Sequence, residues 1–238
     1  MRNLRMDHGF TLVELLVALV VSGVLMTGVY SAFLTQQQSY LAQDQVAEMQ
    51  QNLRAGLNFF TYELRKAGYN PDDDGFQGIT VAEDDIITFA YLADDDNIDN
   101  NDDDGNNSSE GVLASVDEAG EICTVRYDLY TSGGRQNLGR KMGPFDRAAV
   151  AENIDKIEFY YTMADGSQTL APADLQDIRA VSISILAMTD RPDPHYSHTG
   201  SYRPASFADL GTEWTPTDNL NRRRRFQILT VTLRNAGI

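Results

Sequence analysis

The most unusual chemical group near the start of this 238-residue chain is the carboxylate of Glu14, which lies just inside a long apolar run. The twenty residues that follow, 15–34, carry no charge. At about 1.5 Å per residue they would form roughly 30 Å of helix, which is the thickness of a hydrocarbon core. An acid at mid-bilayer costs roughly 2.5–3.5 kcal/mol, and less near the edge. This cost indicates that Glu14 has a partner.

The stretch around Glu14, GFTLVELLVA, resembles a prepilin motif, and this resemblance implies a proteolytic cut after Gly9 that would supply such a partner. Gly9 lets the backbone lie close to a protease without a side chain in the way. Cleavage after Gly9 would leave the α-amine of Phe10 in apolar surroundings, where this cation needs a counter-ion. Glu14 lies one helical turn away, and in a stack of parallel helices it could also meet the amine of a neighbouring copy. Because pairing offsets much of the desolvation, we predict that Glu14 pairs with such an amine and sets the register of an assembly.

Two other classes of N-terminal segment could explain the apolar run. A secretory signal peptide has an apolar region of about 7–15 residues and a cleavage site of small residues. Here the apolar run is longer. The best late cleavage site would be after Ala32, but it would place the bulky Tyr30 where a signal peptidase site has a small residue. An ordinary signal anchor explains the length of the run and the flanking Arg2 and Arg5, but not Glu14. The arginines place the N-terminus in the cytoplasm and the residues beyond 34 outside it.

The stretch GFTLVELLVA, residues 9–18, resembles the prepilin motif of type IV pilins and type II secretion pseudopilins. In that family a membrane aspartyl peptidase cuts after the glycine and methylates the new N-terminus. The resemblance implies cleavage between Gly9 and Phe10, N-methylation of Phe10, and an assembly role for Glu14. It also implies partners: the prepilin peptidase/methyltransferase, the inner membrane, and other minor and major pilins or pseudopilins. Such a subunit is held in the inner membrane by a single pass and then enters a pilus or pseudopilus, and it requires no cofactor.

The residues after the apolar run predict that the helix continues with one apolar face. No proline interrupts residues 35–68, and apolar residues recur every three or four positions, as on a helix that packs by one side. These residues are Val46, Met49, Leu53, Leu57, Phe60, Leu64 and Ala67. Gly68 followed by Pro71 would end the helix. We therefore predict one helix over residues 10–67, roughly 87 Å long at 1.5 Å per residue.

The remainder of the chain predicts β-strands separated by long loops. Five stretches are rich in β-branched and aromatic residues or alternate apolar with polar residues; they are 86–92, 122–130, 157–161, 181–185 and 229–233. Together with one amphipathic helix they predict an α+β domain with an antiparallel sheet. The pilin resemblance implies the same fold class, a long N-terminal helix packed on an antiparallel β-sheet.

The expected organisation has four parts. Residues 1–9 are a leader that the prepilin peptidase removes, and residues 10–34 are a transmembrane and assembly helix. Residues 35–68 are the amphipathic half of the same helix. Residues 69–238 form a globular pilin domain that contains an acidic loop at 94–105.

The composition limits the classes of partner. The formal net charge is −16 at pH 7, so the chain lacks the basic footprint that phosphate binding needs, and we expect no nucleic acid partner. The one cysteine, Cys123, excludes an intrachain disulfide, and its alternation with apolar residues predicts a buried structural thiol. The sequence has no nucleophile motif, no glycine-rich phosphate loop and no histidine cluster, so we expect no enzyme.

The acidic stretch at residues 94–105 has the composition of a cation site. It reads DDDNIDNNDDDG, with seven aspartates and three asparagines, and such oxygen ligands suit a hard cation such as calcium. The candidate ligands are Asp94, Asp96, Asn100, Asp102 and Asp104. The pattern that begins at Asn100 reproduces the start of an EF-hand loop, but its twelfth position is Gly111, where a bidentate glutamate is expected. The alternative is a solvated acidic loop that is kept open by its own repulsion.

Two further groups of side chains could bind a ligand. The four arginines at residues 222–225 could form a nucleic-acid patch, but the net acidity favours a run that pairs with acidic loops of this chain or of a neighbouring subunit. His195 and His198 follow Asp193 at a spacing that could hold a metal. They lie in a Pro- and Ser-rich stretch with no helix to fix them, so we expect a surface pair there.

Three later stretches resemble the PilW-type minor pilins: YELRKAGYNP at 62–71, NIDKIEFYY at 153–161 and RRRRFQILTVTLRN at 222–235. The resemblance implies a minor pilin of a type IV pilus, a structural subunit that primes or caps filament assembly. The J-type minor pseudopilin of a type II secretion system is the close alternative. A different class also remains, a permanently anchored extracytoplasmic binding or sensor domain, or an adhesin that uses loops such as residues 192–216.

Overall fold

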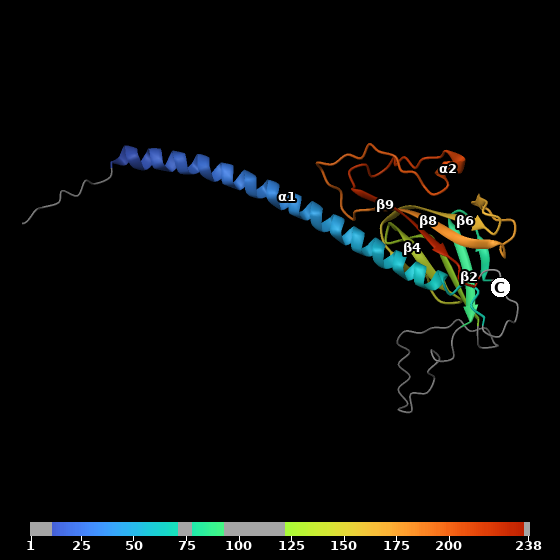
Figure 1. The fold of residues 1–238 in the computed structure, drawn as a ribbon. Coiled ribbons are helices and arrows are strands. Elements are labelled where there is room, and N and C mark those ends of the chain that lie inside the picture. The colour runs from blue at the N-terminus through green and yellow to red at the C-terminus, as the bar shows by residue number, and fades with distance from the viewer. Residues whose placement is uncertain (1–10, 71–77, 93–121, 236–238) are drawn as a thin grey trace, which may run out of the picture. The chain divides into compact units, whose positions relative to one another are not determined.

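The computed structural model describes residues 11–70, 78–92 and 122–235 (Figure 1). The chain divides into two compact units, Met1–Asp44 and Gln45–Ile238. One α-helix, α1 (Leu12–Leu64), provides the regular structure of the described part of the first unit, and its last turns belong to the second unit.

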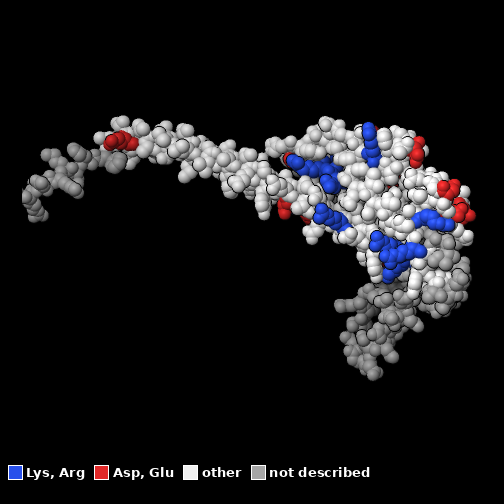
Figure 2. Space-filling model, viewed as in Figure 1, with Lys and Arg blue, Asp and Glu red and all other residues white. Residues whose placement is uncertain are grey.

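The first part of α1 exposes apolar side chains. By length and composition α1 could cross a membrane, with a mean hydropathy of 2.3 over its most apolar 18 residues, none of them buried. After Glu14 the next charged residue is Asp44, and Figure 2 shows acidic side chains near the start of the described helix and none along the stretch that follows. The uncharged run at residues 15–34 is therefore helical, and its side chains are exposed within the first unit.

The end of α1 lies three residues before the predicted one. The N–H of Lys66 donates to the carbonyl of Glu63 (2.9 Å) and the N–H of Ala67 to that of Leu64 (3.1 Å), so the last turn tightens. Gly68 then adopts a φ of 74°, a left-handed conformation that stops a helix and that glycine adopts readily.

Within the described residues, nine strands form two antiparallel sheets. The first sheet is a meander in the order β1-β2-β3-β4-β5, and the second has the order β7-β6-β8-β9. The strands are β1 (Ile79–Ala82), β2 (Ile86–Leu92), β3 (Ile122–Ser132), β4 (Arg135–Met142), β5 (Ala148–Ala151), β6 (Ile154–Met163), β7 (Gln168–Thr169), β8 (Ile178–Met188) and β9 (Arg224–Thr232). The predicted fold class, a long helix on antiparallel strands, is confirmed, although the strands divide into two sheets.

The division between the sheets falls at a two-residue link. Glu152 and Asn153 separate β5 from β6, and Asn153 has a φ of 56°. Asparagine tolerates this left-handed conformation better than most residues. Since the turned backbone cannot continue the ladder of the first sheet, the chain starts a new sheet at Ile154.

The core lies where both sheets turn one face toward the second half of α1. The predicted apolar face of the helix is confirmed: Met49, Leu53, Leu57, Phe60 and Leu64 are all buried. The ring of Phe60 packs edge-on against Tyr127 of β3, with centroids 5.0 Å apart, and lies 5.8 Å from Phe159 of β6. Phe60 therefore joins the helix to both sheets.

Residues 189–223 form a further layer on the outward face of the second sheet (Figure 1). This outer layer contains the short helix α2 (Phe207–Leu210) and a bridge between Tyr202 and Trp214. Tyr202 and Trp214 pack on Phe226 of β9, with ring centroids 5.5 and 5.8 Å away. The N–H of Ala205 donates to the hydroxyl of Ser184 on β8 (2.8 Å). Several residues of the stretch 192–216, which an adhesin could use, are thus packed against the sheet, while most of the stretch is exposed.

Replacement of Gly56 by alanine should destabilise the second unit, although alanine is the better helix former. A Cβ at this position would lie 2.8 Å from the Cβ of Ala151 and 2.8 Å from the carbonyl oxygen of Val150. Helix and strand would have to move apart, and overpacking of this kind costs about 1–3 kcal/mol, more than the roughly 1 kcal/mol gained in helix propensity.

Chemical denaturation measures the effect of Gly56→Ala as a change in the free energy of unfolding. Ala55→Leu is the matched control, because Ala55 is exposed on the same turn and surface substitutions usually stay within about 0.5 kcal/mol. Equal losses in the two variants would show that the close approach of α1 to β5 is not what limits the side chain at Gly56.

Candidate functional site

Glu14 forms a capping box with Thr11 at the start of α1. The backbone N–H and the hydroxyl of Thr11 both donate to Oε2 of Glu14 at 3.0 Å, and the N–H of Glu14 donates to the Thr11 hydroxyl at 3.3 Å. These bonds satisfy donors that a helix N-terminus otherwise leaves free. Sequence reasoning treated Glu14 only as a partner for an amine and missed Thr11, although Thr-x-x-Glu before an apolar run is a readable capping signal.

The capping box leaves part of the Glu14 carboxylate available. Both bonds from Thr11 reach Oε2, so Oε1 accepts no hydrogen bond from the described residues. Glu14 is exposed and shares a shallow hollow of the helix surface with Val17, Ala18 and Val21. Glu14 thus lies in the first turn of α1, which begins at Leu12 and not at the predicted residue 10, while Gly9 and Phe10 lie outside the described residues.

A largely buried ion pair between Glu63 and Arg140 joins the end of α1 to the first sheet. Nε of Arg140 on β4 lies 2.9 Å from both carboxylate oxygens of Glu63, and the hydroxyl of Tyr127 on β3 donates to the same carboxylate. Glu63 and Tyr127 are buried. Burial and the charge of Glu63 raise the pKa of Tyr127 far above its usual range. Glu63 belongs to the stretch 62–71 singled out by the resemblance, but its partners were not predicted.

The arginine run at residues 222–225 pairs within the chain, as predicted. Arg224 is buried and its Nε lies 2.7 Å from Asp155, and the guanidinium of Arg223 lies 2.9 Å from Asp193. Arg222 donates to the carbonyl of Thr189 at 2.9 Å. These bonds tie the start of β9 to the outer layer and to β6, and they account for three of the four arginines.

The other candidate ligands give no metal site in the described part of the chain. His198 uses both ring nitrogens, one toward the Tyr196 hydroxyl (3.2 Å) and one toward the carbonyl of Gly200 (2.8 Å). Across residues 11–70, 78–92 and 122–235, no group of three His, Cys, Asp or Glu side chains is placed to hold a metal. Cys123 is buried as predicted, and burial raises the pKa of its thiol.

The calcium prediction concerns residues that the structure does not describe. Its candidate ligands, Asp94, Asp96, Asn100, Asp102 and Asp104, all lie within 93–121, one of the stretches outside the described residues. Calcium therefore stays a prediction.

Two acidic groups hold the outer layer on the second sheet. The buried carboxylate of Glu158 accepts hydrogen bonds from the N–H (3.2 Å) and the hydroxyl (2.8 Å) of Ser206. The hydroxyl of Tyr160 donates to Asp209, and burial together with this bond raises the pKa of Tyr160 to about 12. Glu158 and Tyr160 stand on the same face of β6, so both bonds fix α2 and the turn before it.

Glu158 should make stability depend on pH. Burial raises the pKa of Glu158, and the bonds from Ser206 offset only part of the rise. The folded state then holds this proton more tightly than the unfolded chain, so the stabilisation is full below about pH 4.3 and is lost as pH rises through the folded pKa. Glu158→Gln, which cannot ionise, should therefore gain stability relative to the wild type as the pH rises above about 4.3.

Urea denaturation at a series of pH values tests this behaviour of Glu158. Ser206→Ala should steepen the loss of stability, because it removes one bond that favours the ionised carboxylate. Wild type and Glu158→Gln with parallel profiles would contradict the raised pKa.

Comparison with known proteins gives a family match at each end of the chain. The prokaryotic N-terminal methylation motif matches residues 4–30, and the type IV pilus-assembly protein W family (PilW) matches residues 145–235. Among solved structures, a type IV-like pilin from Thermus thermophilus is 15% identical, with a TM-score of 0.48, and the match covers 80% of this chain and 100% of that chain. No curated protein matches the sequence.

The two matches fall on the parts of the chain described above. The first contains the capping box and the beginning of the apolar helix. The second contains β5 to β9, the outer layer and the paired arginine run. The recognition of a prepilin motif and of a PilW-type region is therefore confirmed: the first match lies in the N-terminal helix and the second in the later strands.

Proposed function

We propose that this protein is a minor pilin of a type IV pilus, a structural subunit that primes or caps filament assembly. It is cleaved between Gly9 and Phe10 by the prepilin peptidase, which also methylates Phe10. The observation that carries the proposal is that Glu14 stands in the first turn of an uninterrupted helix whose next charged residue is Asp44. The PilW match over residues 145–235 supports the choice of a minor pilin.

The exposed apolar part of α1 suits two successive environments. Before assembly, the stretch from Leu12 onward would cross the inner membrane once, with the N-terminus in the cytoplasm and the second unit outside. After extraction, the same side chains would pack against helices of other pilins. One apolar surface can serve both environments because each replaces water with hydrocarbon contacts.

The charge of Glu14 favours one register of this helix relative to the helices of neighbouring subunits. The amine created at Phe10 is a cation that loses its hydration in either environment. Oε1 of Glu14, which accepts no hydrogen bond from the described residues, can accept one from the amine of the same chain or of a neighbouring subunit. A buried charge without its partner is strongly destabilising, so shifted registers would be disfavoured. The proposed function is therefore structural assembly rather than catalysis.

The mature N-terminus tests the proposal. The full chain is produced in cells that contain a prepilin peptidase, and its intact mass and N-terminal sequence are determined. We expect N-methylated Phe10 as the first residue, and Gly9→Val should block the cut. Gly23→Val is the matched control, because a side chain at Gly23 meets no atom within 4 Å, and it should be processed normally. A chain that keeps Met1 beside an active peptidase would overturn the proposal.

A further inference from the structure

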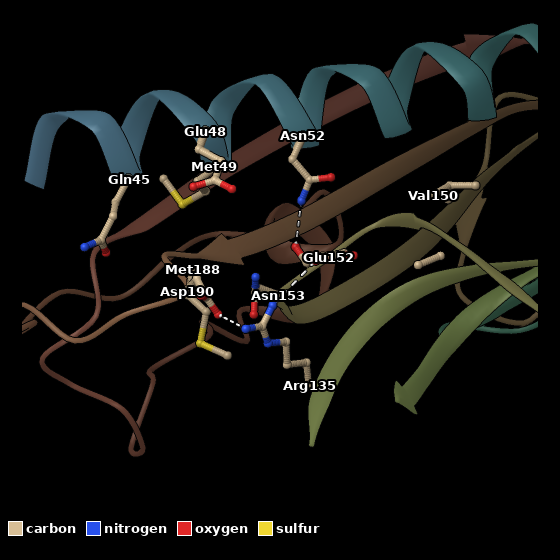
Figure 3. A pocket seen from close by; sticks show the side chains of 11 residues that line it. Gln45, Glu48, Met49, Asn52, Arg135, Val150, Glu152, Asn153, Met188 and Asp190 are labelled. Atoms are coloured by element: carbon tan, nitrogen blue, oxygen red, sulfur yellow. Dashed lines mark hydrogen bonds and ion pairs between the residues drawn. The ribbon is translucent and has the colours of Figure 1, made fainter. Parts of the chain in front are cut away.

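A cavity of about 300 Å³ lies in the second unit between α1 and the link from β5 to β6 (Figure 3). Side chains from four segments line it. The helix contributes Gln45, Glu48, Met49 and Asn52, and the strands and their ends contribute Arg135, Ala149, Val150, Glu152, Asn153, Met188 and Asp190. The volume is at the low end of the range of about 300–1,000 Å³ for small-molecule sites, so it suits a single side chain better than a large ligand.

The cavity holds more negative than positive charge. Among the described residues that line it, the one cation is Arg135, which lies 2.7 Å from Asp190 and 3.7 Å from Glu152. Glu48 is exposed, and its side-chain carboxylate takes part in no hydrogen bond or ion pair with any residue that the structure describes. One guanidinium therefore faces three carboxylates, and a second cation would be attracted.

A buried amide in the cavity also lacks a partner. Asn153 is 9% exposed, and its backbone N–H donates to the side-chain oxygen of Asn137 at 3.2 Å. Its own side-chain amide forms no hydrogen bond within the described residues, and Figure 3 shows it beside Arg135 and Asp190 in the cavity. Its oxygen can accept a hydrogen bond and its nitrogen can donate one, so this amide offers a ligand polar contacts that are independent of the carboxylates.

Part of the remaining wall of the cavity is apolar and adaptable. Met49 and Met188 contribute thioether side chains and Val150 an aliphatic one. Methionine fills irregular space and tolerates different occupants. The cavity thus offers an apolar surface for an alkyl stem next to acceptors for a cationic head.

We propose that this cavity binds the side chain of an arginine from a neighbouring subunit. The stem lies against Met49 and Met188, and the guanidinium faces Glu48, Glu152 and the amide oxygen of Asn153. A guanidinium is favoured over an ammonium because its five donors form a planar fork that can serve several acceptors at once. The neighbouring subunit as the source of the arginine rests on the proposed function, whereas the chemistry of the site does not.

Methionine methyl signals of the full chain in detergent test the proposal. The probe is N-acetyl-arginine methylamide, which presents the side chain without charged backbone ends. Titration should shift the ¹³C-methyl signals of Met49 and Met188 and saturate, while those of Met142 and Met163 outside the cavity stay in place. The citrulline analogue, which has a similar shape and no charge, should produce no saturable shift.

Variants complete the test. Glu48→Gln should weaken binding of the probe about tenfold, because a charge-assisted hydrogen bond of that order is lost. Asp146→Asn, an exposed carboxylate outside the cavity, should leave binding unchanged. Absence of the Met49 and Met188 shifts, or an unchanged affinity in Glu48→Gln, would overturn the site. Tighter binding of the blocked lysine analogue would overturn the choice of arginine, and tighter binding of free arginine would overturn the neighbouring subunit as its source.

The outcome can be separated from that of the proposed function. Probe binding requires only the folded second unit, so Gly9→Val should bind the probe like the wild type. If the probe binds but Phe10 never becomes the first residue, the pilin role fails and the site stands. If Phe10 is processed but the probe does not bind, only the site fails.

Discussion

Glu14→Gln is expected to leave the start of α1 intact and to weaken association with other pilins by at least about a hundredfold. Glutamine can replace glutamate in a capping box, so the bonds with Thr11 can persist. The negative charge is lost, and the methylated amine at Phe10 then lies in apolar surroundings without a counter-ion. Removing one partner of a buried ion pair costs about 3–5 kcal/mol, which corresponds to two or more orders of magnitude in an association constant.

Co-purification of the tagged full chain with other minor and major pilins from detergent measures this association. Thr11→Val is the matched variant, because it removes the hydroxyl of the capping box and keeps the carboxylate. It should cost about 1 kcal/mol of helix stability and weaken assembly far less than Glu14→Gln. If the loss followed the capping box, with Thr11→Val the more damaging change, Glu14 would be a helix cap and not the residue that sets the register.

Glu63→Leu should lower the free energy of unfolding of the second unit by about 3 kcal/mol or more. The substitution leaves the guanidinium of Arg140 and the hydroxyl of Tyr127 without their shared acceptor. Breaking a buried pair by removing one partner costs about 3–5 kcal/mol, and the lower end applies because the Arg140 side chain is 21% exposed. For a domain of this size, each kcal/mol lowers Tm by about 2–4 °C.

Thermal and urea denaturation of a double-mutant cycle isolate the pair. Glu63→Leu combined with Arg140→Met should be less damaging than the sum of the single changes, since no charge is then left buried. The more exposed pair Arg203–Glu213, 2.8 Å apart, is the control, and Glu213→Gln should cost less than about 1 kcal/mol. Additive losses in the cycle would mean that Glu63 stabilises the fold by packing alone.

The elements with regular apolar spacing could be predicted from sequence. The three- and four-residue steps from Met49 to Leu64 indicate one buried helix face, and the alternation in β3 and β8 indicates strands, although both faces of β8 are buried. Strand β4 (Arg135–Met142) could not be predicted in this way. Its buried apolar residue is Leu138, and the next inward position holds Arg140, whose burial depends on Glu63 in α1. The division into two sheets depends on the left-handed backbone of Asn153, which no periodicity records.

The candidate sites differ in the same way. Gly9, Phe10 and Glu14 could be proposed from sequence because a protease site and a helix start are both formed by residues that are neighbours along the chain. The partners of Glu63 stand 64 and 77 positions further along the chain, and the cavity draws its lining from α1, β4, β5 and the end of β8. Such arrangements follow from sheet order and register, which the sequence pattern leaves open.

The burial of the second half of α1 has a consequence for how the protein is made. Its apolar face leaves the ribosome well before Val231 of β9, which belongs to the same core. At about 5–20 residues per second, the roughly 170 residues in between take on the order of 10–30 s to synthesise. Throughout this interval Met49, Leu53 and Phe60 have no completed sheets to cover them. The nascent chain therefore needs either a chaperone or rapid pairing of the early β1–β2 hairpin to avoid association with other copies.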